Sequence, residues 1–132
     1  SSANLAGANL SRIHLIEANL TGADLSNAKL VEVDFSGAIL EGARLVGANL
    51  RKTALTGVDL KSANLSGLNL SGLNLRQTDL SGARLVDVNL SGADLTEANL
   101  KYSEITNARL EDTIYCRTIM PDGSENNSGC SL

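Results

Sequence analysis

The chain has 132 residues, enough for one domain, and a net charge of −4 from 15 acidic and 11 basic residues. This balance lacks the basic surplus of proteins that bind the phosphate backbone, so we expect no nucleic-acid partner. No apolar run reaches the roughly 18 residues that span a bilayer, so we expect no membrane insertion. One Phe, two Tyr and no Trp, beside 42% hydrophobic residues, indicate a regular interior in which one small volume recurs.

A five-residue period runs from Ala3 to Asp112 and divides this stretch into 22 units. Every unit has a bulky apolar residue at its centre, nearly always Leu. The residue two positions earlier is Ala in 13 units and small or aliphatic in the others. Between these two stands Asn or Asp in 14 units, and the last position is often Gly, as at Gly7 and Gly22. Such self-similarity is typical of a repeat architecture.

A period of five fits neither a straight helix nor a straight strand. On an α-helix five residues turn by roughly 500°, so the leucines would wind around all sides. On a strand they would alternate between the two faces. The conflict disappears if the chain bends once per unit, with the Ala and Leu positions pointing inward and the Asn or Asp position facing water. The Gly-rich end of each unit then supplies the corner, since Gly accepts a positive φ.

This pattern resembles the pentapeptide-repeat family, whose consensus is Ala, Asp or Asn, Leu and two variable residues. The resemblance covers about 110 of the 132 residues. It implies an all-β solenoid, a right-handed quadrilateral (square) β-helix with four units per coil, hence about 5.5 coils. We therefore expect residues 1–112 to form the β-helix and residues 113–132 to form a short C-terminal cap.

With four units per coil, residues 20 apart stack. We expect the structural core to include Leu25, Phe35, Leu45, Leu65 and Leu85. Phe35 is the only ring among the central positions, and its side also carries the oversized residues Ile13, Val33 and Leu73. The sequence therefore predicts a slight bulge or offset on that side, rather than a ligand cavity.

The N-terminal end contrasts with this core. The chain begins at Ser1 without Met, which indicates a processed or trimmed end. Whether a targeting segment has been removed stays an open alternative. The repeat starts at Ala3 with no preceding helix or polar cap, so Leu5 and Leu10 are expected to lie in an uncovered coil. Either a cap has been lost or this end docks a partner, and a homodimer through the N-terminal coil is one such interpretation.

The repeat fades after Asp112, and Pro121-Asp122-Gly123 has turn chemistry. A solenoid needs a terminal cap because its last coil exposes apolar side chains and strand edges. Cys116 and Cys130 both lie in this tail. A disulfide between them would close a loop of about 15 residues, worth roughly 3 kcal/mol in the chain-entropy account. The alternative is two free thiols in a cytosolic protein.

The two readings of the cysteines predict different compartments. A disulfide indicates an oxidising one, the periplasm, thylakoid lumen or exterior, whereas free thiols indicate the cytoplasm. The segment from Cys116 to Gly123 also resembles the C-terminal sequences of cyanobacterial members of the family. Some cyanobacterial and plant members are located in the thylakoid lumen.

The sequence offers little that could carry out chemistry. Its only His, His14, falls at an outward position, and two cysteines with no nearby His make a poor zinc site. Asp59 and Asp79 are expected to stack one coil apart, which is typical of a solvated surface, with weak cation binding as the alternative. There is no phosphate-binding loop. We predict no enzyme activity, no metal and no cofactor.

Two functional hypotheses follow. The first is a non-enzymatic structural or protein-interaction scaffold with an unknown protein partner. The second comes from the resemblance, because some family members mimic a DNA duplex and bind DNA gyrase or topoisomerase. Mimicry needs a continuous acidic surface. Here acids and bases share columns, as with Glu41 above Lys61 and Lys101, or Glu32 above Lys52. The sequence favours the scaffold.

Overall fold

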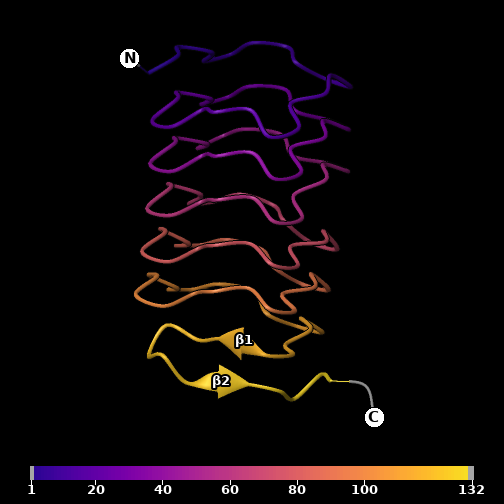
Figure 1. Cartoon of the computed structure of the whole chain (residues 1–132), viewed down its shortest axis with the longest axis vertical. Coiled ribbons are helices and arrows are strands. Elements are labelled where there is room, and N and C mark those ends of the chain that lie inside the picture. Colours follow the sequence, from indigo (N-terminus) through magenta and orange to yellow (C-terminus); the bar gives the residue numbers. More distant parts are fainter. Residues whose placement is uncertain (1, 131–132) are drawn as a thin grey trace.

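The computed structural model describes residues 2–130, and Ser1, Ser131 and Leu132 lie outside the described residues. The chain winds as a stack of similar coils, with the two ends of the chain at opposite ends of the stack (Figure 1). Two short strands follow at the C-terminal end: β1, Thr118–Ile119, and β2, Glu125–Asn126. No helix in the described part of the chain is long and apolar enough to cross a membrane.

Parallel bridges join each coil to the next. They connect residues 20 apart, from Asn4 with Asp24 to Asn99 with Ile119. Twenty residues are four units of five, so each turn of the chain has four units, as the resemblance implies. The bridging residue is the one between the two inward positions. Its N–H donates to the preceding coil and the N–H of the next residue donates to the following coil, as Asp24 N–H does to the Ala3 carbonyl and Leu25 N–H to the Arg44 carbonyl.

The corners follow one backbone rule. The residue two places after the central apolar residue has a positive φ in all 22 units, but it is Gly in only 10 of them. The other 12 units hold residues such as Lys52, Gln77 and Asp87 at φ values near 60°. A side chain in this conformation costs roughly 1–2 kcal/mol. The turn is therefore imposed by the pairing of the coils and does not depend on glycine.

Asn and Asp at the bridging position have a structural task. In all 14 units that contain them, the side-chain oxygen accepts the backbone N–H of the residue two places later, as Asn64 does from Ser66. This is the local bond by which Asx residues stabilise turns. The outward position was expected only to face water. Its preference for Asn and Asp comes from this bond at the corner.

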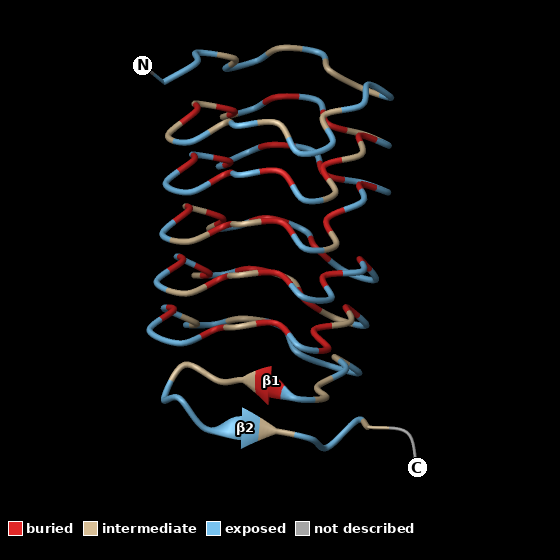
Figure 2. Cartoon of the chain, in the orientation of Figure 1, coloured by how far each residue is buried: buried red, intermediate tan, exposed pale blue. Residues whose placement is uncertain are grey.

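The interior is a column of apolar side chains. Figure 2 shows buried residues recurring at the same places in each middle coil. The five residues expected in the core are all at most 1% exposed: Leu25, Phe35, Leu45, Leu65 and Leu85. Phe35 and nine leucines surround a void of about 10 Å³, room for one water at most. Because its walls are entirely apolar, we expect this void to be dry.

Candidate interaction surface

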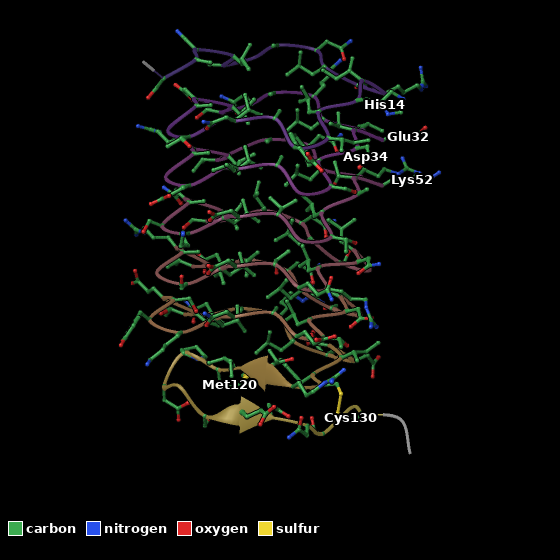
Figure 3. All side chains as sticks on the ribbon, viewed as in Figure 1. His14, Glu32, Asp34, Lys52, Met120 and Cys130 are labelled. Atoms are coloured by element: carbon green, nitrogen blue, oxygen red, sulfur yellow. A yellow bond between two sulfur atoms is a disulfide. The ribbon has the colours of Figure 1, made fainter. Side chains whose placement is uncertain are left out.

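The outward side chains form ladders on the sides of the stack (Figure 3). Charges of opposite sign alternate along several of them. Ion pairs between neighbouring coils join Arg12 to Glu32 at 3.9 Å and Arg84 to Glu104 at 3.8 Å. These pairs are largely exposed, so each contributes little to stability. They do, however, interrupt any continuous acidic field on the surface.

His14 is exposed and bridges to Asp34 in the next coil. Asp34 accepts hydrogen bonds from the Ser36 hydroxyl at 2.6 Å and the Ser36 N–H at 2.9 Å. These bonds, led by the one from the hydroxyl, hold the pKa of Asp34 below its ordinary value, and the charge of His14 acts in the same direction. The carboxylate of Asp34 therefore stabilises the turn at the end of its own unit.

Asp59 and Asp79 are bridged one coil apart. Each accepts the N–H two residues later, and the Nζ of Lys61 lies 3.4 Å from Asp59. The hydrogen bond to Asp59, with the charge of that carboxylate, raises the pKa of Lys61. A lysine thus occupies the place beside these acids where a cation would sit. Within residues 2–130, no group of three or more His, Cys, Asp or Glu side chains could hold a metal ion.

One junction between coils is open. The ladder of backbone hydrogen bonds is regular from coil to coil, except between residues 47–55 and 66–74, which we call the open seam. Two bridges are missing there, Asn49 with Asn69 and Ala54 with Asn74, although both neighbouring junctions are complete. Six backbone bonds that the repeat makes elsewhere are not formed between these two segments.

The open seam admits solvent toward the core. It forms a groove of about 680 Å³. Most core residues of the middle coils are at most 2% exposed, whereas those beside the seam reach higher values. The values are 9% for Ala48, 4% for Leu50, 5% for Thr53, 3% for Leu55, 3% for Leu68 and 8% for Leu73. The only charged side chains that line the groove are Arg51 and Lys52.

The sequence contains a local cause for this opening. Leu68 and Leu73 occupy the position that is Ala in 13 units, and they are the only two leucines at that position. A well-packed interior has no room for extra methylene groups without a backbone shift. Thr53 and Leu73 lie on the side that carries Phe35, where an offset was expected, but Phe35 itself keeps its bonds, as its N–H bonds to Ala54 at 2.9 Å. The separation lies one coil further on, and it opens a groove where only a bulge was expected.

The tail contributes a different kind of structure. β1 pairs with β2 antiparallel, and the turn between them is closed by the Met120 N–H donating to Ser124 at 2.7 Å. The Thr118 hydroxyl, fully buried, donates to the Leu95 carbonyl at 2.7 Å. Cys116 and Cys130 form a disulfide with their Cα atoms 4.8 Å apart. In Figure 3 the sulfur bond lies beside the last residues of the described chain.

The other end of the stack has no such segment in the described residues. Leu5, Leu10, Leu15 and Leu20 pack against the core but are only partly buried. Ile16 is 53% exposed. The first described coil therefore presents apolar side chains along the axis of the stack.

Comparison with known proteins identifies the repeat. The family described as Pentapeptide repeats (8 copies) matches residues 1–37, 28–67, 43–82 and 74–112. A search of curated proteins finds no match.

The solved structures that are similar to this chain include the following three. A pentapeptide repeat protein (Rfr23) from the cyanobacterium Cyanothece 51142 is 35% identical, with 84% of this chain and 86% of that chain covered and a TM-score of 0.48. HetL, a pentapeptide repeat protein involved in heterocyst differentiation regulation in Nostoc, is 27% identical, with coverages of 96% and 82% and a TM-score of 0.42. A pentapeptide repeat protein of the Arabidopsis thaliana thylakoid lumen is 21% identical, with coverages of 89% and 72% and a TM-score of 0.31.

Pentapeptide repeat proteins fold as right-handed quadrilateral β-helices and are generally non-catalytic structural or interaction proteins. The family match spans residues 1–112, well over half of the chain. This chain belongs to the pentapeptide repeat family.

Proposed function

We propose that this protein is a non-enzymatic scaffold that binds a partner protein through its outward ladders. The observation that carries the proposal is the bridging of residues 20 apart, which sets variable outward side chains in register along the stack. Such a surface offers extended contact with a partner, as in other solenoids. Catalysis needs groups that converge in a concave site, and the outward positions diverge from the axis.

Gyrase binding by DNA mimicry is the less favoured function. The net charge is only −4, and basic residues interrupt the acidic columns, as Arg84 does above Glu104. A field of this kind lacks the continuous negative potential of a duplex. A supercoiling assay with DNA gyrase separates the two functions. We expect no inhibition of supercoiling at micromolar protein. Inhibition would favour DNA mimicry over the scaffold function.

The proposal includes a division of the chain into a rod and a cap. With four units in each coil, the 22 units of residues 1–112 form about 5.5 coils. Residues 113–132 then end the ladder, supported by the β1–β2 pair and by the disulfide. Limited proteolysis after reduction should remove the tail first. Cleavage within the rod before cleavage in the tail would contradict this division.

The same proposal places the protein in an oxidising compartment, the periplasm or the thylakoid lumen. The Cys116–Cys130 disulfide supports it, because disulfides are rare in cytosolic proteins. A thiol count on protein purified without reductant should find none. Two free thiols would instead favour the cytoplasm.

A homodimer through the N-terminal coil completes the proposal. Its support is the partial exposure of Leu5, Leu10, Leu15 and Leu20 at that end of the stack. Sedimentation should show association that weakens when Ile16 is replaced by Glu. A monomer at high concentration would count against the dimer and would leave the scaffold role untouched.

The scaffold role itself is tested by photo-crosslinking. A photoreactive residue is placed at one outward bridging position on each side of the stack, at Arg44, Asn89, Ala54 and Asp79. Each variant is exposed to an extract of the organism from which the sequence comes. We expect one side to give a discrete protein adduct that the other sides do not. Equal, diffuse labelling from all four sides would contradict a specific scaffold.

A further inference from the structure

The open seam, residues 47–55 facing 66–74, presents unpaired backbone groups on both of its edges. The first edge has free N–H groups at Gly47, Leu50, Lys52 and Leu55, interleaved with the carbonyls of Ala48 and Thr53. The opposite edge has free carbonyls at Ser66, Asn69, Ser71 and Asn74, with the N–H groups of Asn69 and Asn74. None of these groups has a hydrogen-bond partner among the described residues. Backbone groups of this kind need water or another partner, because leaving their hydrogen bonds unmade costs free energy.

The pattern of donors and acceptors identifies the kind of partner. A small anion uses donors alone and is repelled by the carbonyls interleaved among them. An extended peptide supplies both N–H and C=O along both of its edges, which is what an unpaired strand edge recognises. Because the seam turns a corner at Arg51 and Lys52, the occupant must be extended, bent once and extended again. The groove volume of about 680 Å³ falls in the range of ligand-binding pockets.

The charge at the seam indicates what side chains the occupant carries. Arg51 and Lys52 are exposed, and neither takes part in an ion pair among residues 2–130. Glu32 precedes Lys52 in the same corner column, but its carboxylate pairs with Arg12 at 3.9 Å. Figure 3 shows Glu32 and Lys52 projecting from the same side of the stack. No carboxylate lines the groove. A partner with acidic side chains complements this site.

We propose that the open seam is a binding site for a bent, extended, acidic peptide segment of a partner protein. The segment completes the interrupted ladder with its backbone, and its carboxylates pair with Arg51 and Lys52. Leu68 and Leu73 keep the seam open in the free protein, so the site is present before the partner arrives. This inference rests on the proposed scaffold role and gives it a location.

The test uses a labelled synthetic peptide with two Val-Glu-Val segments joined by Ser-Gly. Fluorescence anisotropy measures its binding to the wild-type protein and to the double variant Arg51→Glu/Lys52→Glu. Lys29→Glu is the matched control, because Lys29 is exposed on the same side but in a complete part of the ladder. We expect the double variant to bind at least about tenfold more weakly and the control to bind within about twofold of wild type.

Two altered peptides separate backbone pairing from charge attraction. A version with Lys in place of Glu should bind at least about tenfold more weakly. A version with N-methyl groups on alternate amides keeps its charge but loses donors, and it should lose most of its binding. If the N-methylated peptide binds as tightly as the unmodified one, strand pairing is overturned. If inorganic phosphate displaces the peptide, the seam is an anion site instead.

Hydrogen exchange tests the premise directly. In the free protein the amides of Leu50 and Lys52 should exchange at least about a hundredfold faster than those of Leu30 and Leu70, which are paired, and peptide should slow them. If the Leu50 and Lys52 amides are protected from exchange in the free protein, the proposal is overturned. It is also overturned if dimerisation alone protects these amides. Failure of the peptide with photo-crosslinks still seen on another side would remove the seam site and leave the scaffold standing.

Discussion

The repeat region and the tail differ in what holds them together. In residues 3–112 the same bonds recur every 20 residues, so each coil is stabilised by its two neighbours. In the tail the ladder continues only to Ile119 and Pro121. Contacts that do not recur are added there, namely the Arg117 N–H bond to the Asn127 side chain and the Cys116–Cys130 disulfide. Repetition therefore tolerates variation in most units, whereas the end of the ladder depends on individual residues.

The largest effect is expected from Leu65→Asp in the middle of the stack. Leu65 is 1% exposed, and a carboxylate there would be buried without a partner. We expect the free energy of unfolding to fall by more than about 4 kcal/mol, measured by urea denaturation. Leu65→Met keeps the volume and should cost less than about 1.5 kcal/mol. If Leu65→Asp unfolds near the wild-type urea concentration, the inward assignment of the central residues is wrong.

Removal of the disulfide should have the next largest effect, and it should act on the tail. The bridge joins residues separated by 14 positions, and opening a loop of this size costs about 3 kcal/mol in the chain-entropy account. We expect Cys116→Ser/Cys130→Ser to expose the β1 and β2 amides to fast exchange while the middle coils stay protected. The reduced wild-type protein is the control. Uniform loss of protection through all coils would mean that the tail and the repeat region unfold as one unit.

The corners give a matched pair of smaller effects. Gly57 has a φ of 72° with no atom within 4 Å of an added Cβ, so Gly57→Ala should destabilise only through backbone strain, by about 1 kcal/mol. Gln77 has a φ of 61°, and Gln77→Gly should relieve the same strain. We expect a gain of roughly 0.5–1 kcal/mol, since part of the relief is lost to the entropy of the unfolded chain. Opposite signs in thermal denaturation support the corner rule, and equal signs would contradict it.

The smallest effect concerns pH. The pKa of Asp34 is lowered in the folded protein, mainly by the Ser36 hydroxyl. Its stabilising contribution is therefore present above the ordinary value of 3.8 and is lost as the pH falls through the lower folded pKa. Asp34→Asn keeps an oxygen for the Ser36 N–H but does not titrate. Urea denaturation at a series of acid pH values should show a shallower pH dependence for this variant, and an unchanged slope would contradict the assignment.

Prediction from the sequence succeeded where a property belongs to one unit. The inward direction of the Leu and Ala positions follows from strand alternation, and residues such as Leu25 and Phe35 are buried accordingly. The role of Asn and Asp was missed, although the signal was present. Asx residues two places before a corner N–H are typical turn formers, and this spacing recurs in 14 units.

The candidate site was missed for a different reason. Leu68 and Leu73 were visible as exceptions to the Ala position, but their consequence depends on which residues stack on them. The predicted offset on the side of Phe35 included Leu73 but specified no junction, and the ring of Phe35 is itself accommodated with its hydrogen bonds intact. Two consecutive leucines at the smaller position instead coincide with the loss of bonds to residues 47–55.

The five-residue period, the inner and outer faces of each unit, and the tail as the region that departs from the repeat are all visible in the amino-acid sequence. Those properties depend on contacts within one or two units, which the chain specifies locally. Which junction stays open, and the hydrogen bond from Thr118 to Leu95 across 23 positions, became visible only in the folded chain. Such features depend on contacts between coils, where a shift in one unit changes the hydrogen bonds of residues 20 positions away.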